Sequence, residues 1–299
     1  MYLLSKSLQA VLWSSLFLSS VFASGDLKPI FLFKDVLESN YTALTTSGFD
    51  TLVIFRVGVL ATGDLVYYAT GSAAQAVTIT AVSNGTYVGG AQLANKIKSY
   101  KTGNTTVNRV EVSLVSADTT FVNIENLINT EGVGPTTILY QNFKALKAAW
   151  TLDAVNNDDE SNYDVPSTLK FAEMLGTIGY KYTSAPYTNL DFWSTVGSSL
   201  NETNPGMYDR LYLQCYDGGE NNDPGEWQDV LDMKIVPLLW VTNDDKPEYG
   251  NTPALSQIKF ANWSSLYSVA GGGYWNDYDI ERMNSSYTLY ADALLDVFG

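Results

Sequence analysis

The sequence predicts a single (β/α)₈ (TIM) barrel with a small β excursion after its second strand. Eight apolar segments of strand length alternate with helical patterns along the 299 residues. Several of these segments are almost continuously apolar, which a parallel sheet covered on both faces requires. No linker rich in Pro or Ser divides the chain. A doubly wound open sheet is the alternative, but no glycine-rich phosphate loop follows the first strand, and eight strands suit closure.

The expected elements follow one another in regular order. Strands are expected over residues 30–33, 49–59, 109–115, 155–160, 180–185, 210–216, 235–240 and 269–275. Helices are expected over residues 91–100, 121–128, 138–149, 167–177, 192–200, 227–231, 254–261 and 284–298. Asp118 is a candidate cap for the second of these helices. The excursion consists of β-type runs at 65–68 and 77–82, with Asn84-Gly85 as a turn.

The amino terminus has the pattern of a secretory signal over residues 1–23. Lys6 precedes an apolar run at 10–18, and Val21-Phe22-Ala23 has the small-x-small form of a cleavage site. A membrane anchor is less favoured, because the run is short and interrupted by serines. We therefore expect a secreted protein whose barrel occupies residues 24–299.

Glycosylation and cysteine usage agree with export. Six Asn-x-Ser/Thr triplets follow the expected signal, and we expect the protein to be N-glycosylated. They begin at Asn40, Asn84, Asn104, Asn201, Asn262 and Asn284. Cys215 is the single cysteine, so no intramolecular disulfide is possible and the hydrophobic core must supply the stability.

The net charge and the amino-acid composition exclude several classes of partner and of catalytic centre. The net charge of −15 opposes nucleic acid and anionic membranes, so we expect neither as a partner. The chain has no histidine, which excludes Ser-His-Asp and Cys-His centres and the usual imidazole zinc site. Catalysis would then use carboxylates, amides, tyrosines or a hard metal. We expect a monomer with no cofactor and no metal.

The expected fourth strand ends in an acidic cluster. Residues 151–160 read Thr-Leu-Asp-Ala-Val-Asn-Asn-Asp-Asp-Glu. Strand alternation would place Asn156, Asp158 and Glu160 on one face, about 6–7 Å apart in sequential pairs. Crowded carboxyls repel, so one of them keeps its proton and can act as a general acid. Two other interpretations are a solvated turn and a calcium loop, although Ser161 stands where an EF-hand needs Gly.

Three other expected strands also end in short sequence motifs. Thr183-Ser-Ala-Pro ends the fifth strand, Gln214-Cys-Tyr-Asp ends the sixth, and Gly-Gly-Gly-Tyr precedes Trp275 in the eighth. Together with residues 153–160, these motifs resemble glycoside hydrolase family 18, whose fourth strand carries Asp-Gly-x-Asp-x-Asp-x-Glu. The sixth-strand motif is similar to the Gln-x-Tyr-Asn of plant-type chitinase/lysozymes. The resemblance covers residues 150–276, with the four motifs in family order.

The resemblance implies a retaining mechanism in which the 2-acetamido group of the substrate is the nucleophile. Glu160 would protonate the glycosidic oxygen and later activate water. Asp158 would orient the acetamido group, and Tyr216 would hydrogen-bond its carbonyl. The remaining implied contacts to the sugar come from Asn156, Asp153, Gln214, Asp217, Trp275, Tyr187 and Trp240. Without the motif order, Trp275, Trp240 and Tyr216 would be read as core aromatics.

The sequence also departs from the family pattern. Asn156 replaces the middle Asp, Ala154 replaces Gly, and Asn157 replaces an aromatic residue, while the third strand has Ser-Leu-Val-Ser at 113–116 in place of Ser-x-Gly-Gly. With Asn156, the sharing of a proton between two carboxyls at positions 156 and 158 is lost.

Three functions stay open. The leading hypothesis is a secreted hydrolase of a polysaccharide or oligosaccharide that contains N-acetylated amino sugar, such as chitin or peptidoglycan. A chitinase-like protein that binds sugar without turnover is the second; Asn156 favours it, whereas retention of Asp158 and Glu160 opposes it. The third is a barrel glycosidase acting on another amino-sugar polymer or an unrelated glycan, with Asp158 as a direct nucleophile.

Overall fold

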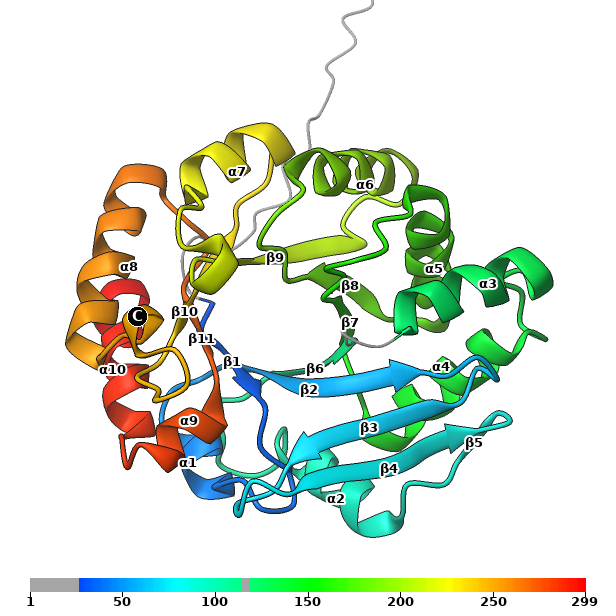
Figure 1. Cartoon of the computed structure of the whole chain (residues 1–299), viewed down its shortest axis with the longest axis horizontal. Coiled ribbons are helices and arrows are strands. Elements are labelled where there is room, and N and C mark those ends of the chain that lie inside the picture. Colours follow the sequence, from blue (N-terminus) through cyan, green and yellow to red (C-terminus); the bar gives the residue numbers. More distant parts are fainter. Residues whose placement is uncertain (1–26, 115–118) are drawn as a thin grey trace, which may run out of the picture.

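Eight parallel strands close into a barrel in the computed structural model, which describes residues 27–114 and 119–299. Each barrel strand pairs with the next, and β1 pairs with both β2 and β11, which completes the ring (Figure 1). The strands are β1 (Pro29–Leu32), β2 (Thr51–Val59), β6 (Arg109–Leu114), β7 (Ala154–Asn157), β8 (Lys181–Ser184), β9 (Tyr208–Gln214), β10 (Val236–Trp240) and β11 (Gly273–Trp275). The predicted fold class is confirmed. The expected signal over 1–23, the cap Asp118 and residues 115–116 lie outside the described residues.

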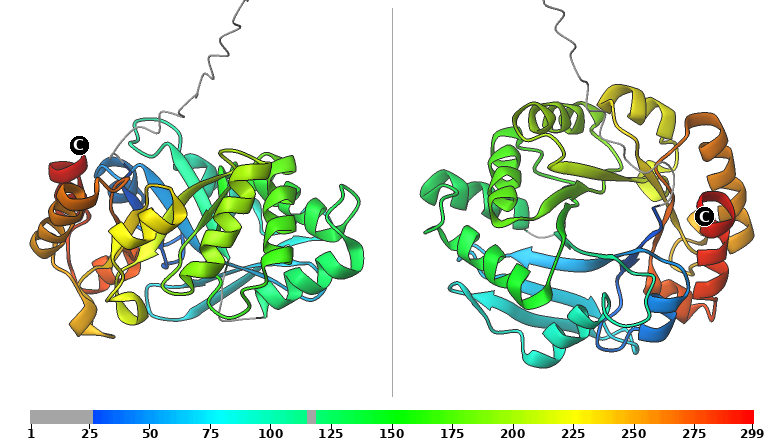
Figure 2. Two further views of the ribbon diagram at one scale, coloured as in Figure 1. Left: turned by 90° about the horizontal axis from the view of Figure 1, so that it is seen from above. Right: turned by 180° about the vertical axis from the view of Figure 1, so that it is seen from behind.

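Helices surround the strands, as Figure 2 shows from behind. They are α1 (Tyr41–Thr46), α2 (Ala91–Ser99), α3 (Thr120–Glu131), α4 (Ile138–Trp150), α5 (Val165–Ile178), α6 (Leu190–Thr203), α7 (Pro224–Leu231), α8 (Pro253–Tyr267), α9 (Asp277–Arg282) and α10 (Tyr287–Phe298). Side chains cap several of them; Asp164 accepts from the Ser167 amide at the start of α5, and Thr252 accepts from the Leu255 amide at the start of α8. The helices α1 and α9 were not expected, because six residues are too few for a periodic pattern.

The β excursion has the expected position. The strands β3 (Leu65–Thr70), β4 (Ala76–Ser83) and β5 (Thr86–Tyr87) extend the outer part of β2 as an antiparallel ribbon (Figure 1). Asn84 and Gly85 both have positive φ, at 48° and 73°, as a two-residue hairpin turn requires. Tyr67 is buried on the ribbon and meets the Trp150 ring of α4 edge-on at 5.9 Å. The ribbon is therefore packed onto the barrel through α4.

Two strands differ from the sequence expectation by three residues or more at one end. The fourth barrel strand ends at Asn157 rather than at residue 160, where its partner β8 ends at Ser184, in register with Asn157. The last strand is confined to Gly273–Trp275. A β-strand extends only as far as neighbouring strands supply hydrogen-bond partners.

The barrel interior contains a buried carboxylate with a full set of donors. Glu111 is completely buried and accepts hydrogen bonds from Arg109 Nε at 2.6 Å, Thr183 Oγ1 at 2.7 Å and the Tyr212 hydroxyl at 2.7 Å. Arg109 also forms a two-pronged pair with Asp209. Because a buried charge is tolerated only when it is paired and hydrogen-bonded, this network is a structural element of the barrel.

Candidate active site

The side-chain amide of Gln214 brings three strand ends together at the barrel mouth. Its Nε2 donates to the Ala185 carbonyl oxygen at 2.7 Å, to Asp158 Oδ1 at 3.2 Å and to Glu160 Oε1 at 3.4 Å. An amide nitrogen has two hydrogens for these three acceptors. At least two acceptors therefore share one hydrogen, and the two carboxyl groups converge on the same small region.

Asp158 and Glu160 differ in their surroundings. Asp158 is 7% exposed, whereas Glu160 is exposed. Burial raises the pKa of Asp158 well above its usual range; the charges of Glu160 and Asp159 raise it further, and Arg56 opposes the shift. A buried carboxyl with a raised pKa beside an exposed carboxyl can take part in proton transfer.

Asn156 lies completely buried below these carboxyls, in β7. Its Oδ1 accepts from Ser113 Oγ at 2.9 Å, and its Nδ2 donates to Thr183 Oγ1 at 3.0 Å. The Thr183 hydroxyl in turn donates to Glu111. The neighbouring strands β6 and β8 thus fix the orientation of the amide, and a hydrogen-bonded chain connects it to the buried Glu111 carboxylate.

Asp159 shapes the loop that carries Glu160. Its own amide donates to Asn157 Oδ1 at 2.8 Å. Its carboxylate accepts from the backbone amides of Ser161 and Asn162, at 3.0 and 2.9 Å, and of Tyr163, at 2.8 Å. The turn interpretation of the acidic cluster therefore holds for Asp159, although this side chain is buried rather than solvated.

Tyr216 and Trp240 form one aromatic side of the mouth. Tyr216 is buried, with its ring centroid 5.8 Å from that of Trp240. Burial raises the pKa of the Tyr216 hydroxyl, and the charges of Asp158 and Glu160 raise it further, which places this hydroxyl in the electrostatic field of both carboxyls. The Trp240 indole nitrogen donates to Asp279 Oδ2 at 2.7 Å, which fixes the ring.

Trp275 lies on an aromatic base. Its ring meets Phe55 edge-on at 4.6 Å and lies 5.5 Å from Phe33 and 5.9 Å from Phe31, measured between centroids. The side chain is half-buried, so part of the indole stays accessible. A rigid aromatic face of this kind suits the C–H surface of a sugar ring.

Three further predicted residues occupy different positions. Asp153 lies at the amino end of β7, where it accepts from Lys101 Nζ at 2.6 Å and from the Val110 amide at 2.8 Å. The length of the strand separates it from Asp158, so the structure does not bring it to the mouth. Asp217 forms an ion pair with Lys246 in the loop after β9. Tyr187 is half-buried, after β8, with its ring close to Gly218.

Arg56 is a residue that the sequence reasoning missed. It is half-buried in β2, its guanidinium lies 5.7 Å from the ring centroids of both Phe55 and Tyr68, and its charge acts on Asp158. The available signal was a single charged residue within the otherwise apolar run 52–59. Across residues 27–114 and 119–299, no group of three or more His, Cys, Asp or Glu side chains could hold a metal ion.

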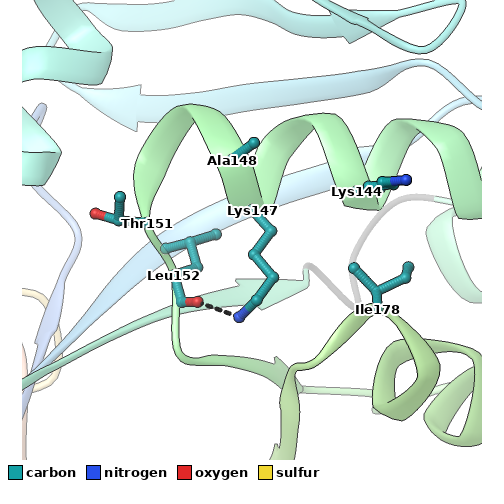
Figure 3. Close-up of a pocket in the computed structure, with 6 residues that line it drawn as sticks. All are labelled: Lys144, Lys147, Ala148, Thr151, Leu152 and Ile178. Carbon is teal, nitrogen blue, oxygen red and sulfur yellow. Dashed lines mark hydrogen bonds between the residues drawn. The ribbon is translucent and has the colours of Figure 1, made fainter.

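A separate hollow of about 480 Å³ lies beside the carboxyl end of α4 (Figure 3). It is lined by Lys144, Lys147, Ala148, Thr151, Leu152 and Ile178. Lys147 donates to the Leu152 carbonyl oxygen at 2.6 Å, and burial lowers the pKa of this lysine. None of the mouth residues lines this hollow.

Comparison with known proteins finds similar structures but no similar sequence family. No protein-family model matches the chain, and no curated protein matches its sequence. Among solved structures, a fungal endo-β-N-acetylglucosaminidase of glycosyl hydrolase family 18 is similar, with 12% identity, a TM-score of 0.62 and coverage of 90% of this chain and 98% of that chain. A family 18 chitinase from Cycas revoluta in complex with allosamidin has 12% identity, a TM-score of 0.56 and coverage of 91% and 100%.

An inhibitor is also among the similar structures. The xylanase-α-amylase inhibitor protein XAIP-I, in complex with trehalose, has 13% identity, a TM-score of 0.52 and coverage of 91% of this chain and 99% of that chain. Both enzymes and an inhibitor therefore share this architecture. The chain has the barrel fold of these family 18 structures and shares few identical residues with them.

Proposed function

We propose that this protein is a glycoside hydrolase that cleaves a polysaccharide or oligosaccharide containing N-acetylated amino sugar. The observation that carries the proposal is the convergence of Asp158 and Glu160 on the Gln214 amide at the mouth of a family 18-type barrel. Tyr216 supplies a hydroxyl in the electrostatic field of this pair, and Trp275 supplies a half-exposed aromatic face at the carboxyl end of β11. The similar structure with bound allosamidin supports a carbohydrate ligand.

The proposed reaction retains the configuration at the anomeric carbon. Glu160, the exposed member of the pair, donates its proton to the glycosidic oxygen while the substrate's acetamido oxygen attacks the anomeric carbon. Asp158 accepts from the acetamido N–H, and the Tyr216 hydroxyl donates to the acetamido oxygen. Glu160 then removes a proton from water, which opens the cyclic intermediate and restores the acid.

The proposed roles require one proton on the carboxyl pair, and that proton must lie on Glu160 when the glycosidic bond breaks. Two carboxyls beside one amide resist double ionisation, and the buried Asp158 is the one whose pKa is raised. The positive charge of Arg56 favours ionisation of Asp158 when positive charge develops on the acetamido group. In the proposed reaction, the proton that the buried Asp158 retains must therefore pass to Glu160 when substrate binds, which leaves Asp158 ionised to accept from the acetamido N–H.

Hydrolysis of chitin oligosaccharides, peptidoglycan fragments and N-glycan cores tests the proposal, with Glu160→Gln as the variant. We expect turnover of at least one of these substrates and its loss in Glu160→Gln. Glu173→Gln is a matched control, because Glu173 is exposed on α5, the helix that follows the same strand. Equal activity in the Glu160→Gln variant and the wild type would remove Glu160 from the mechanism.

Sugar binding without turnover is the second candidate function. The observation that favours it is the Asn156 amide, which Ser113 and Thr183 hold in the position where the family motif has an Asp. The similarity to an inhibitor protein supports it as well. Calorimetry that shows binding of a chito-oligosaccharide, combined with no product after long incubation, would decide for this function.

We also propose that the protein is exported, N-glycosylated and monomeric, without a nucleic-acid or membrane partner. The six asparagines of the Asn-x-Ser/Thr triplets are all exposed. None of them lies in the loops that follow β7, β8, β9 or β10, so glycans would leave this side of the mouth open. In residues 27–114 and 119–299, no helix is both long and apolar enough to cross a bilayer. The mass of protein secreted from eukaryotic cells, before and after removal of N-glycans, tests glycosylation.

A further inference from the structure

Helix α8 carries large apolar side chains on its solvent side as well as on its buried side. Leu255, Ile258 and Leu266 are 42%, 67% and 61% exposed, and we call these three residues the α8 stripe. On the other side of the helix, Phe260 is completely buried, 5.6 Å from the Tyr274 ring of β11. The packing of α8 on the barrel therefore does not use the α8 stripe.

Asn262 lies within the α8 stripe. At about 100° and 1.5 Å per helical residue, the stripe and Asn262 fall within an arc of roughly 80° over about 16 Å. Asn262 is four residues from Ile258 and four residues from Leu266, so it neighbours both on the helix surface. It is exposed, and it begins the triplet Asn262-Trp263-Ser264.

We propose that Asn262 carries an N-linked glycan that covers the α8 stripe. The proposal rests on the export proposed above, since only an exported chain meets the glycosylation machinery. A glycan is bulky and strongly hydrated, so attachment between Ile258 and Leu266 would shield both from other proteins. Exposed apolar surface that is left uncovered promotes association.

A second copy of the chain is a less suitable cover. A stable interface buries about 800 Å² on each partner, whereas the α8 stripe consists of three side chains along one helix. The glycan acceptor, in contrast, lies between the exposed side chains themselves. Helix α8 belongs to the outer ring of helices (Figure 1), so the glycan would also leave the mouth accessible.

The full chain, expressed in eukaryotic cells and purified from the medium, provides the test. Peptide mapping by mass spectrometry is expected to find a glycan on Asn262. Sedimentation velocity at rising concentration is expected to show a monomer for the wild type and association for Asn262→Gln. Asn201→Gln is the matched control: Asn201 is an exposed acceptor on α6, and its neighbours four residues away are Gly197 and Pro205 rather than large apolar residues.

A rescue experiment distinguishes loss of the glycan that covers the α8 stripe from a failure of the variant to fold. Replacing Ile258 and Leu266 by Ser in the Asn262→Gln background is expected to restore the monomer, or the secreted yield if Asn262→Gln alone is retained in the cell. An unmodified Asn262 in the secreted protein would overturn the proposal. So would identical behaviour of Asn262→Gln and Asn201→Gln, or failure of the Ser replacements to rescue. Hydrolysis measured on the same samples distinguishes a failure here from a failure of the proposed function.

Discussion

A hydrogen bond of 3.2 Å joins Gln214 Nε2, at the end of β9, to Asp158 Oδ1, directly after β7. It spans the position of β8, and the same nitrogen is anchored to the Ala185 carbonyl oxygen that follows β8. Three consecutive barrel strands are thus tied together at their carboxyl ends. The same amide also donates to Glu160 Oε1, so it contacts both members of the carboxyl pair.

Replacement of Gln214 by Ala is expected to reduce turnover while leaving the barrel folded. The variant loses the common donor to Asp158 and Glu160, and hydrogen bonds to charged groups contribute about 1.5–3 kcal/mol. That corresponds to a decrease in kcat/KM of roughly 10- to 150-fold. Steady-state kinetics measure the effect, and Gln257→Ala on the outer helix α8 is the control. Unchanged kcat/KM in Gln214→Ala would contradict a role for the amide.

Replacement of Asp158 by Asn is expected to abolish turnover and to increase stability at neutral pH. The folded-state pKa of Asp158 is raised above the unfolded value of about 3.9, so its stabilising contribution is complete below that pH and is lost as the pH rises. Asn removes this penalty. The gain, about 1.4 kcal/mol for each unit by which the pKa is raised, should vanish towards pH 4.

Thermal unfolding of Asp158→Asn and wild type at a series of pH values measures this difference. The exposed Asp229→Asn on α7 is the control and should follow the wild type. A melting temperature of Asp158→Asn below that of wild type at neutral pH would show that Asp158 is stabilised as a carboxylate.

Replacement of Asn156 by Asp is expected to destabilise the protein as the pH rises. The new carboxyl would be buried, and once ionised it could no longer donate to Thr183. The free energy of unfolding should fall by about 1–3 kcal/mol at neutral pH, with recovery in acid, where the protonated carboxyl can donate again. Denaturant titrations at two pH values measure the effect. The same loss at both values would indicate a steric cause instead.

Trp275 is expected to contribute to both packing and substrate affinity. Trp275→Ala removes the contacts with Phe33 and Phe55 and should cost about 3 kcal/mol, at the lower end of the range for large aromatic truncations because the ring is only half-buried. Trp275→Phe should recover most of the stability. Under the proposed function, KM should rise more than kcat falls in Trp275→Ala. If kcat alone falls, the indole is not a binding surface for the sugar.

Local patterns in the sequence determined much of the architecture. The apolar runs predicted all eight barrel strands, and Asn84-Gly85 predicted the turn of the excursion, because strand formation and turn geometry depend on neighbouring residues. The order of the motifs also indicated which strand ends form the mouth. The short helices α1 and α9 left too weak a periodic signal to be found.

Only the tertiary structure decided how the mouth is arranged. It ended β7 at Asn157, in register with the end of β8, separated Asp153 from the site, and brought Arg56 towards Asp158 from a strand about one hundred residues away in the chain. It also made Asp158 the buried carboxyl and left Glu160 exposed. Burial, long-range hydrogen bonds and the field of distant charges depend on which segments meet, and local sequence does not contain that information.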